Sequence, residues 1–486
     1  MCKCNQENCN LEVFENTDKC ILHCEKDKWD NSKGSINLFW SQIKNTLDSK
    51  YKDSFFDSST MDELHIYDNV IFPEFQKDIT YNKYEDNEER CGTNFYSYER
   101  FYYPDGDNRE ELNTIISSIN ISFRNCKFLD NAELSRYNFQ KNIDFQNCEF
   151  YGDLKLNNTD IKGKLVFKKS FFHKKIDISN SNFSILNIND SFIYEIKTAY
   201  SVFNDISVFS NNIFYSDVYF EMNTFEKNVY FRNSIFLNKL NLRDTIFKED
   251  KNFLGILFKL DIHKLNKMEF TDKNKMYIKN LEIKDNPILG DRETARIIKD
   301  SFEHKNNIIE ANKFYALEMK EREKELEIDM KEGKNFFEWF IFKIHGLSSN
   351  HSQDWLLAFF WIFIIGFIAS YYDFNLIQDN NGKFVHFEII SIFKMIGLVF
   401  IVLSITQICK IKDKLLNGMT FLISFYLVYI YATQDYLLNL FSKTINPFSV
   451  MKSNDPINVI QLFFKIIIAY LIYQLIISIR QNTRRK

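Results

Sequence analysis

The chain is poor in the residues that interrupt regular structure, with 13 glycines and 5 prolines among 486 residues. Linkers and disordered tracts are usually rich in these residues, so their scarcity disfavours a disordered protein. An excess of one charge is also lacking, since the formal net charge is −4. This balance disfavours a nucleic-acid-binding protein. Residues 1–30 are polar and charged, unlike a secretory signal.

Catalytic motifs are lacking as well. The sequence contains no HExxH motif, no GxSxG motif and no glycine-rich loop of the kind that binds phosphate. The 8 histidines are scattered, and no pair of carboxylates is singled out by its spacing. The sequence therefore predicts that the protein is not an enzyme.

Phenylalanine, in contrast, is abundant, with 50 residues, and much of it recurs at a fixed period. From Phe123 to Phe247 the apolar centres alternate in steps of five and six residues, with a slip at residues 188–198. Neither a helix nor a strand has this period. The pattern predicts a solenoid, whose units bury their apolar side by stacking on one another.

A small or polar residue stands two positions before each centre that ends a five-residue step. These residues are Cys126, Cys148, Thr159, Ser170, Ser181, Ser201, Asn212, Asn223, Ser234 and Thr245. The pattern resembles the pentapeptide-repeat family, although alternate units carry an extra residue and alanine is scarce at the small position. The resemblance implies a right-handed, quadrilateral β-helix with about 22 residues in each coil, a coil rise of roughly 4.8 Å and the centres pointing inward. The alternative is an irregular, phenylalanine-rich β-sandwich.

The stacked centres are expected to form the dry axis of this β-helix. The core residues predicted in this way include Phe145, Phe150, Phe167, Phe172, Phe220, Phe225, Phe231 and Phe236. Because an open coil edge would pair with other strands, the region before the repeat is expected to cover the first coil.

The N-terminal segment gathers six residues with soft ligand atoms. These are Cys2, Cys4, Cys9, Cys20, His23 and Cys24. A tetrahedral zinc ion needs four thiolates or imidazoles, and structural sites take them from two short turns. The spacing predicts a structural zinc site formed by Cys4, Cys9, Cys20 and Cys24, with Cys2 or His23 as substitutes. The alternatives are a redox cluster or reduced free thiols, and disulfides are expected only if this end is exported.

The sequence divides into five predicted regions. They are a Cys-rich zinc knuckle (1–28), a mixed cap (29–119), the pentapeptide-repeat-like β-helix (120–255), a connector with an α-helical hairpin or stalk (256–333), and a transmembrane domain (334–486). The segments RETARIIKDSFEHKNNIIEANKFYALEMKERE and IIAYLIYQLIISIRQNTRRK are similar to bacterial membrane-anchored pentapeptide-repeat proteins. That resemblance implies no catalytic residues.

The C-terminal third predicts an all-α transmembrane domain of about four helices, each close to the length that a bilayer requires. The expected spans are about 355–372, 389–409, 416–434 and 459–479. Basic residues cluster between the second and third spans and after the fourth. By the positive-inside rule, both termini are expected to face the cytoplasm of a multi-pass protein in the bacterial inner membrane.

Polar residues in or beside these spans are the functional candidates of this region. They are Lys394, Gln434, Asp435 and Lys465. The simpler explanation for the two lysines is that they extend towards the interface.

Together these observations predict a membrane-anchored cytoplasmic scaffold or sensing protein, which presents a rigid β-helix to a protein partner. The expected partners are the lipid bilayer, an unidentified protein and a second copy of the chain, whereas nucleic acid is not expected. The alternative is a subunit of a membrane pore or ion channel with the β-helix as its cytoplasmic regulatory domain. No TVGYG-like filter for potassium occurs.

Overall fold

The computed structural model describes most of residues 4–26, parts of 35–46, and residues 64–73, 93–94, 119–135, 138–268, 270–281, 289–380, 414–451 and 458–483. The chain divides into two compact units, Met1–Asn306 and Asn307–Lys486. Each unit is described by itself.

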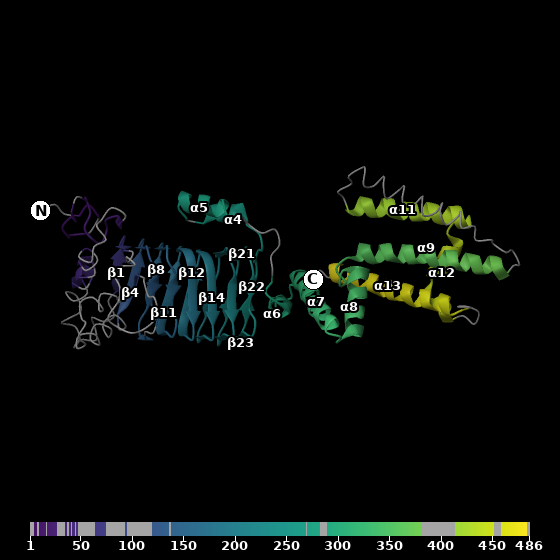
Figure 1. Cartoon of the computed structure of the whole chain (residues 1–486), viewed down its shortest axis with the longest axis horizontal. Helices are drawn as coiled ribbons and strands as arrows, with labels where there is room; N and C mark the ends of the chain where they lie inside the picture. Colours follow the sequence, from purple (N-terminus) through teal and green to yellow (C-terminus); the bar gives the residue numbers. More distant parts are fainter. Residues whose placement is uncertain are drawn as a thin grey trace. The chain divides into compact units, whose positions relative to one another are not determined.

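The first unit is a parallel β-solenoid, in which short strands stack in sequence order (Figure 1). Its strands are β1 (Leu64–Asp68), β2 (Ile71–Phe72), β3 (Thr93–Asn94), β4 (Asn120–Arg124), β5 (Lys127–Phe128), β6 (Ala132–Glu133), β7 (Asn138–Phe139), β8 (Ile143–Gln146), β9 (Glu149–Phe150), β10 (Leu154–Lys155), β11 (Asp160–Lys168), β12 (Phe171–Ser179), β13 (Asn182–Asn189), β14 (Phe192–Ala199), β15 (Val202–Phe203), β16 (Ser207–Val208), β17 (Ile213–Phe214), β18 (Val218–Glu221), β19 (Thr224–Phe225), β20 (Val229–Tyr230), β21 (Ile235–Phe236), β22 (Leu240–Asn241), β23 (Ile246–Phe247) and β24 (Lys251–Asn252). The solenoid predicted from the repeat is confirmed.

The register places each apolar centre directly over the centre of the next coil. Phe123 pairs with Phe145, and Phe145 pairs with Phe167 in parallel strands. The rings of Phe123 and Phe145 stack with centroids 4.7 Å apart, and those of Phe128 and Phe150 stack at 4.6 Å. These separations equal the spacing of hydrogen-bonded strands, so the rings keep contact while the backbone ladder is satisfied.

Small residues occupy the corners and satisfy buried backbone groups. The Oγ of Ser170 accepts a hydrogen bond from the N–H of Cys148, and the Oγ of Ser191 accepts one from the N–H of Ser170. The residue before each corner adopts a positive φ, for example Asn147 (54°) and Lys169 (55°). Asparagine tolerates this left-handed conformation better than most residues, which explains its recurrence before the small position.

The slip in the repeat corresponds to two shorter strands. β11 and β12 contain nine residues each, whereas their partners β13 and β14 contain eight. The register shifts by one residue between Ile161 and Lys164, and again between Phe172 and Lys175. The coil therefore loses residues at bulges while its apolar columns stay aligned.

The solenoid begins earlier than the sequence indicated. β1 pairs with β4 and β2 pairs with β5, so residues 64–73 supply the first coil instead of belonging wholly to a separate cap at 29–119. A long insertion separates β2 from β4, and this interruption hides the repeat. Phe39, in a helical segment before β1, contacts the ring of Phe72 at 5.7 Å and covers this end. The rest of the predicted cap lies largely outside the described residues.

Helices cover the far end and one side of the solenoid. At the far end, the N–H of Leu242 donates to Thr294 Oγ1 of α6 (Arg292–His304) at 2.8 Å, and Lys251 pairs with Asp300 at 2.6 Å. Helices α4 (Ile262–Lys267) and α5 (Asp272–Lys279) lie over one side of the strands (Figure 1). They pack on a column of outward-pointing apolar residues, which consists of Phe171, Phe192, Ile213, Ile235 and Leu237.

The second unit is entirely helical in its described residues. Its elements are α7 (Ile308–Lys331), α8 (Phe336–Ser349), α9 (Trp355–Asn380), α11 (Lys414–Thr433), α12 (Asn439–Ile445), the 3₁₀ helix η4 (Pro447–Met451) and α13 (Val459–Thr483). α11 and α13 each run alongside α9, and α8 crosses the ends of α9 and α13 (Figure 1). Gly366 lets α12 approach α9 closely, since a Cβ there would lie 2.8 Å from the Phe441 ring.

Two helices of this unit are long and apolar enough to cross a membrane, Trp355–Ile377 and Val459–Gln481. They correspond to the first and fourth predicted spans. The third predicted span coincides with α11, whose described apolar part, Gly418–Thr433, is shorter. The second, 389–409, lies outside the described residues. Among the described residues the count is therefore two, instead of about four.

Candidate functional site

Four side chains of the N-terminal segment bring one ligand atom each into a small cluster. They are Cys4, Cys9, Cys20 and His23, and these atoms lie within 4.8 Å of one another. Cys4 Sγ is 3.6 Å from His23 Nδ1, and Cys9 Sγ is 3.7 Å from Cys20 Sγ. Zn–S bonds of about 2.3 Å and Zn–N bonds of about 2.0 Å would place tetrahedral ligand atoms roughly 3.5–3.8 Å apart. The cluster therefore has the dimensions of a metal site.

The orientation of His23 suits a ligand. Its Nδ1 faces the sulfur atoms, while Nε2 lies 3.1 Å from the backbone carbonyl of Asp68 in β1. A carbonyl can only accept, so the proton of a neutral imidazole resides on Nε2 and leaves the Nδ1 lone pair directed at the thiols. Metal-bound histidines are held by their second nitrogen in this way.

Burial and backbone dipoles set the protonation of these groups. Burial raises the pKa of Cys20 to about 12 and lowers the pKa of His23. Burial also opposes ionisation of Cys4, but the backbone N–H groups of Cys20 and Gln6 outweigh it and lower the pKa of this thiol. A bound cation would reverse the penalty at Cys20, because a coordinating thiol loses its proton.

Cys24 lies outside the cluster, so the fourth position predicted for it is occupied by His23. The Cys24 Sγ points to the carbonyl of Ile21 at 3.7 Å and accepts from Lys26 Nζ at 3.5 Å. A tight turn follows Cys20, where the N–H groups of His23 and Cys24 both donate to the Cys20 carbonyl. This turn brings the His23 ring to the Cys20 thiol, whereas the Cys24 side chain points away from it. Sequence reasoning named His23 only as a substitute ligand, together with Cys2; the spacing Cys20-x-x-His23 was the available signal.

The cluster is attached to the first coil of the solenoid. Besides the contact of His23 with Asp68, the N–H of Ile71 donates to the carbonyl of Leu22 at 2.9 Å. The cluster therefore fixes a short, polar segment against an edge that would otherwise be open for strand pairing.

The predicted core phenylalanines all lie inside the solenoid. Each of Phe145, Phe150, Phe167, Phe172, Phe220, Phe225, Phe231 and Phe236 is buried. Their rings fill the axis of the described solenoid.

Of the polar residues predicted in the membrane region, Asp435 and Lys465 have side-chain hydrogen-bond partners in the structure. Asp435 accepts from the N–H groups of Asn439 and Leu440 at the start of α12, and Gln434 ends α11 with φ of 57°. Lys465 is buried and donates to Ser449 Oγ of η4, which replaces the expectation that it extends to the interface. Lys394 lies outside the described residues.

Sequence reasoning missed Asp373, which joins three elements. Its carboxylate accepts from Thr444 of α12 at 2.6 Å and from the amide of Gln461 of α13 at 2.7 Å. Asp373 lies just beyond the predicted end of the first span. An acid so close to the apolar run of a helix was the available signal.

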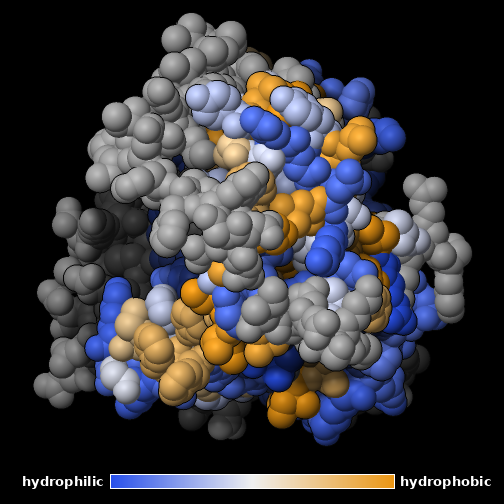
Figure 2. All heavy atoms as spheres, turned by 90° about the vertical axis from the view of Figure 1, so that its right-hand side faces the viewer, coloured by the Kyte–Doolittle hydropathy of each residue, from blue (hydrophilic) through white to orange (hydrophobic). Residues whose placement is uncertain are grey.

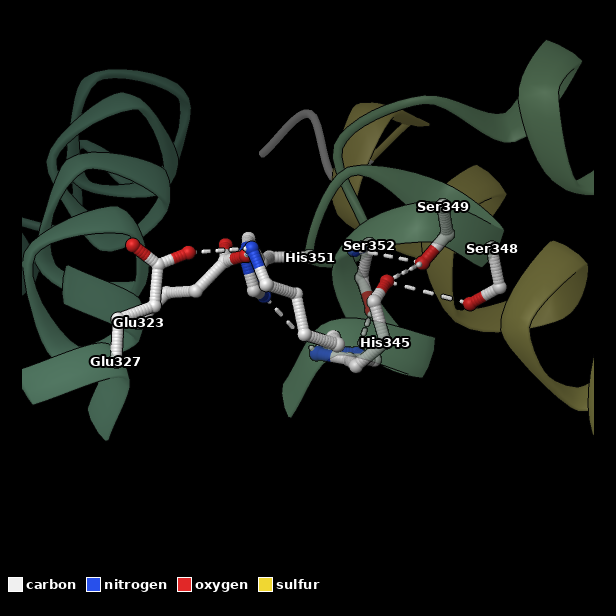
Figure 3. A network of polar contacts seen from close by, with 8 residues as sticks. Glu323, Glu327, His345, Ser348, Ser349, His351 and Ser352 are labelled. Carbon is white, nitrogen blue, oxygen red and sulfur yellow. Dashed lines mark hydrogen bonds and ion pairs between the residues drawn. The ribbon is translucent and has the colours of Figure 1, made fainter. Parts of the chain in front are cut away.

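A second polar network links α7 with α8 and the turn that follows it (Figure 3), and Gln474 joins it to α13. His351 Nε2 lies 3.3 Å from Glu323, and its Nδ1 lies 3.3 Å from Nδ1 of His345. His345 Nε2 is 3.1 Å from Ser352 Oγ, which donates to Gln474 at 3.1 Å. Residues 350–352 all have a positive φ, an unusual run that places His351 inside the unit. Burial and the neighbouring His351 lower the pKa of His345.

Comparisons of this chain with protein-family models, curated proteins and solved structures found no match.

Proposed function

We propose that this protein is a membrane-anchored scaffold or sensing protein, which presents a rigid β-helix to a protein partner at the inner face of a bacterial membrane. In this proposal the β-helix is right-handed and pentapeptide-repeat-like, and both termini face the cytoplasm. The helical unit is a multi-pass anchor that includes the predicted second and third spans. The observation that carries the proposal is the combination, in one chain, of a solenoid whose strands pair with one another and two long apolar helices.

The surface of the two apolar helices supports a lipid environment. Fewer than half of the residues in either apolar window are buried inside the unit. Val459 is 81% exposed and Phe463 is 61% exposed on α13. Exposed apolar side chains are also visible among polar ones in the space-filling view (Figure 2). A core helix of a soluble protein would cover such side chains, whereas lipid solvates them.

The solenoid supports a binding role without catalysis. Its corners and columns satisfy buried backbone groups and pack the axis, so the outer faces are held in place before any partner arrives. A preorganised surface binds without an additional ordering cost. The metal cluster supports the same role, because it fixes one end of the solenoid. Three thiolates and one imidazole suit zinc, which we propose as its structural ion.

The test is chemical crosslinking of the full chain in its native membranes, with residues 307–486 alone as the matched control. A scaffold is expected to yield one protein crosslinked to residues 120–255 in constant ratio, absent with the control. Crosslinks to copies of the same chain would indicate a homo-oligomer instead. Crosslinks to no protein at all would contradict the proposal. Extraction of the chain from membranes by alkaline carbonate would contradict the anchor.

The second candidate is a membrane pore, and one observation favours it. α12 and η4 form short helices between α11 and α13, with Asp373 directed at Thr444 of α12. Short helices of this kind, placed between spans and lined by a polar group, are used by channels. Liposomes that contain the full chain would show ion flux, and Asp373→Asn would alter it. Absence of flux over a range of voltage and pH would reject the pore.

A further inference from the structure

α8 is a helix with two unlike faces. One face is apolar and exposed, and its residues recur at spacings of three and four that place them on a single stripe. We call it the α8 stripe; its residues are Phe336, Phe337, Phe340, Ile341, Ile344 and Leu347. Phe337 is 80% exposed and Leu347 is 64% exposed. An exposed stripe of large apolar side chains indicates an interaction surface.

The opposite face of α8 is held by α7. Lys343 pairs with both Glu323 and Glu327 at 2.6 Å, and Arg322 donates to Glu338 at 2.8 Å. The charged groups of α8 are therefore already paired within the unit. These pairs connect α8 to α7 and do not cover the α8 stripe.

The stripe continues into the surface of the first apolar helix. Five residues separate α8 from α9, and the indole N–H of Trp361 on α9 donates to the carbonyl of Leu347 at 3.0 Å. Trp355 and Phe359 on α9 are each 39% exposed. If α9 spans a bilayer, α8, which crosses it, lies along the membrane surface (Figure 1).

We infer that the α8 stripe binds the boundary between headgroups and acyl chains of the bilayer, and that α8 thereby holds the C-terminal part of α7 against the membrane. An amphipathic helix in this position inserts its apolar face into that boundary. This inference rests on the proposed membrane anchor. Since Glu338 and Lys343 already have partners, the contact depends on apolar burial and is independent of the charge of the lipids.

The test places a photoreactive group on each face of α8 in the full chain. Phe340→p-benzoylphenylalanine puts the group on the α8 stripe. The matched control is Phe342→p-benzoylphenylalanine, because the Phe342 ring lies 6.3 Å from that of His351 and faces inward. Phe359→p-benzoylphenylalanine reports on the anchor. Each variant is reconstituted in nanodiscs of phosphatidylcholine, with or without phosphatidylglycerol, and lipid adducts are measured by mass spectrometry.

Lipid adducts several-fold more abundant at position 340 than at 342, and equal in both lipid compositions, are the expected result. Adducts at 359 but not at 340 would overturn the inference and leave the anchor intact. Adducts at neither position would overturn both. Crosslinking of position 340 to a second copy of the chain would assign the α8 stripe to a dimer contact instead. Adducts that require phosphatidylglycerol would overturn the claim of charge independence.

Discussion

The two units of this protein are stabilised in opposite ways. In the solenoid the same contact recurs once in every coil, as in the hydrogen bonds from Cys148 to Ser170 and from Ser170 to Ser191. In the helical unit the polar contacts follow no repeat; the contact of His351 with Glu323, for example, joins the turn after α8 to α7. A repeated contact is partly replaced by its neighbours when it is lost, whereas a single contact is not.

This difference predicts where each unit is sensitive. A coil at the end of the solenoid has only one neighbouring coil. The stability of the first coil should therefore depend on the Cys4, Cys9, Cys20 and His23 cluster beside it. The interior coils should respond locally to a change.

The largest effect is expected at the metal cluster. Cys20→Ser should abolish metal binding, whereas Cys24→Ser should retain one ion per chain, because Cys20 belongs to the cluster and Cys24 does not. Structural zinc sites contribute apparent binding energies of about 10–16 kcal/mol in small domains, so loss of the ion should expose the first coil. Metal content by mass spectrometry and hydrogen exchange of β1 measure both effects. Loss of metal in Cys24→Ser would show that Cys24, and not His23, is the fourth ligand.

A core substitution in an interior coil comes next. Phe150→Ala removes a ring that stacks on both Phe128 and Phe172, and it should lower the free energy of unfolding by about 3–5 kcal/mol. Phe150→Leu is the control, since leucine and isoleucine occur in neighbouring columns, and it should cost clearly less. Urea unfolding of the full chain, followed by circular dichroism, gives the values. Equal losses in both variants would contradict the role of ring stacking.

Acidification should loosen the helical unit at α7 and α8. The pKa of His345 is lowered, so below the ordinary histidine pKa of about 6.5 the unfolded state binds a proton that the folded state resists. The free energy of unfolding of the helical unit is therefore highest above that pH. It falls as the pH is lowered, by up to about 1.4 kcal/mol per pH unit. The groups that face His345 are His351, Ser352 and Gln474, with Glu323 and Lys343 beyond His351.

Hydrogen exchange of α7 and α8 at about pH 7.5 and about pH 5.5 measures this effect, with intrinsic exchange rates corrected for pH. His345→Gln should remove most of the difference, since glutamine keeps a polar group and does not titrate. An unchanged difference in His345→Gln would assign the sensitivity to other groups. Burial raises the pKa of Glu323, but Lys343 and His351 outweigh this effect and lower it. Glu323 therefore titrates at a more acidic pH than the histidines.

The smallest effect is a gain in stability. Met222 has a φ of 54° at a corner where asparagine stands in several other coils. Met222→Asn should stabilise the solenoid by up to about 1 kcal/mol, because the left-handed conformation costs asparagine less. Asn233→Met is the reciprocal control and should destabilise it by a similar amount. Urea midpoints of both variants check this prediction, and shifts of the same sign would refute it.

The repeat was predictable because each centre has its partner one coil away. The columns that contain Phe145 and Phe150 follow from counting along the sequence, and the same count locates the small corner residues. The long apolar runs of α9 and α13 were predictable for a similar reason, since each is a property of one continuous segment.

The remaining features depend on contacts between segments whose separation in the sequence follows no period. The first coil comes from residues 64–73, which lie a long insertion before the repeat. The fourth member of the metal cluster is His23, because the turn after Cys20 and the carbonyl of Asp68 orient this ring. The meeting of His345, His351 and Glu323 likewise requires the left-handed turn between α8 and α9.

By itself, the sequence determined that the chain forms a phenylalanine-cored solenoid and carries long apolar helices, because periodicity and local apolar composition act over a few residues at a time. Only the tertiary structure decided which side chains meet at the metal cluster, at Asp373 and along the two faces of α8. Those meetings depend on the path of the backbone between distant segments, and turn geometry at a few left-handed residues sets that path.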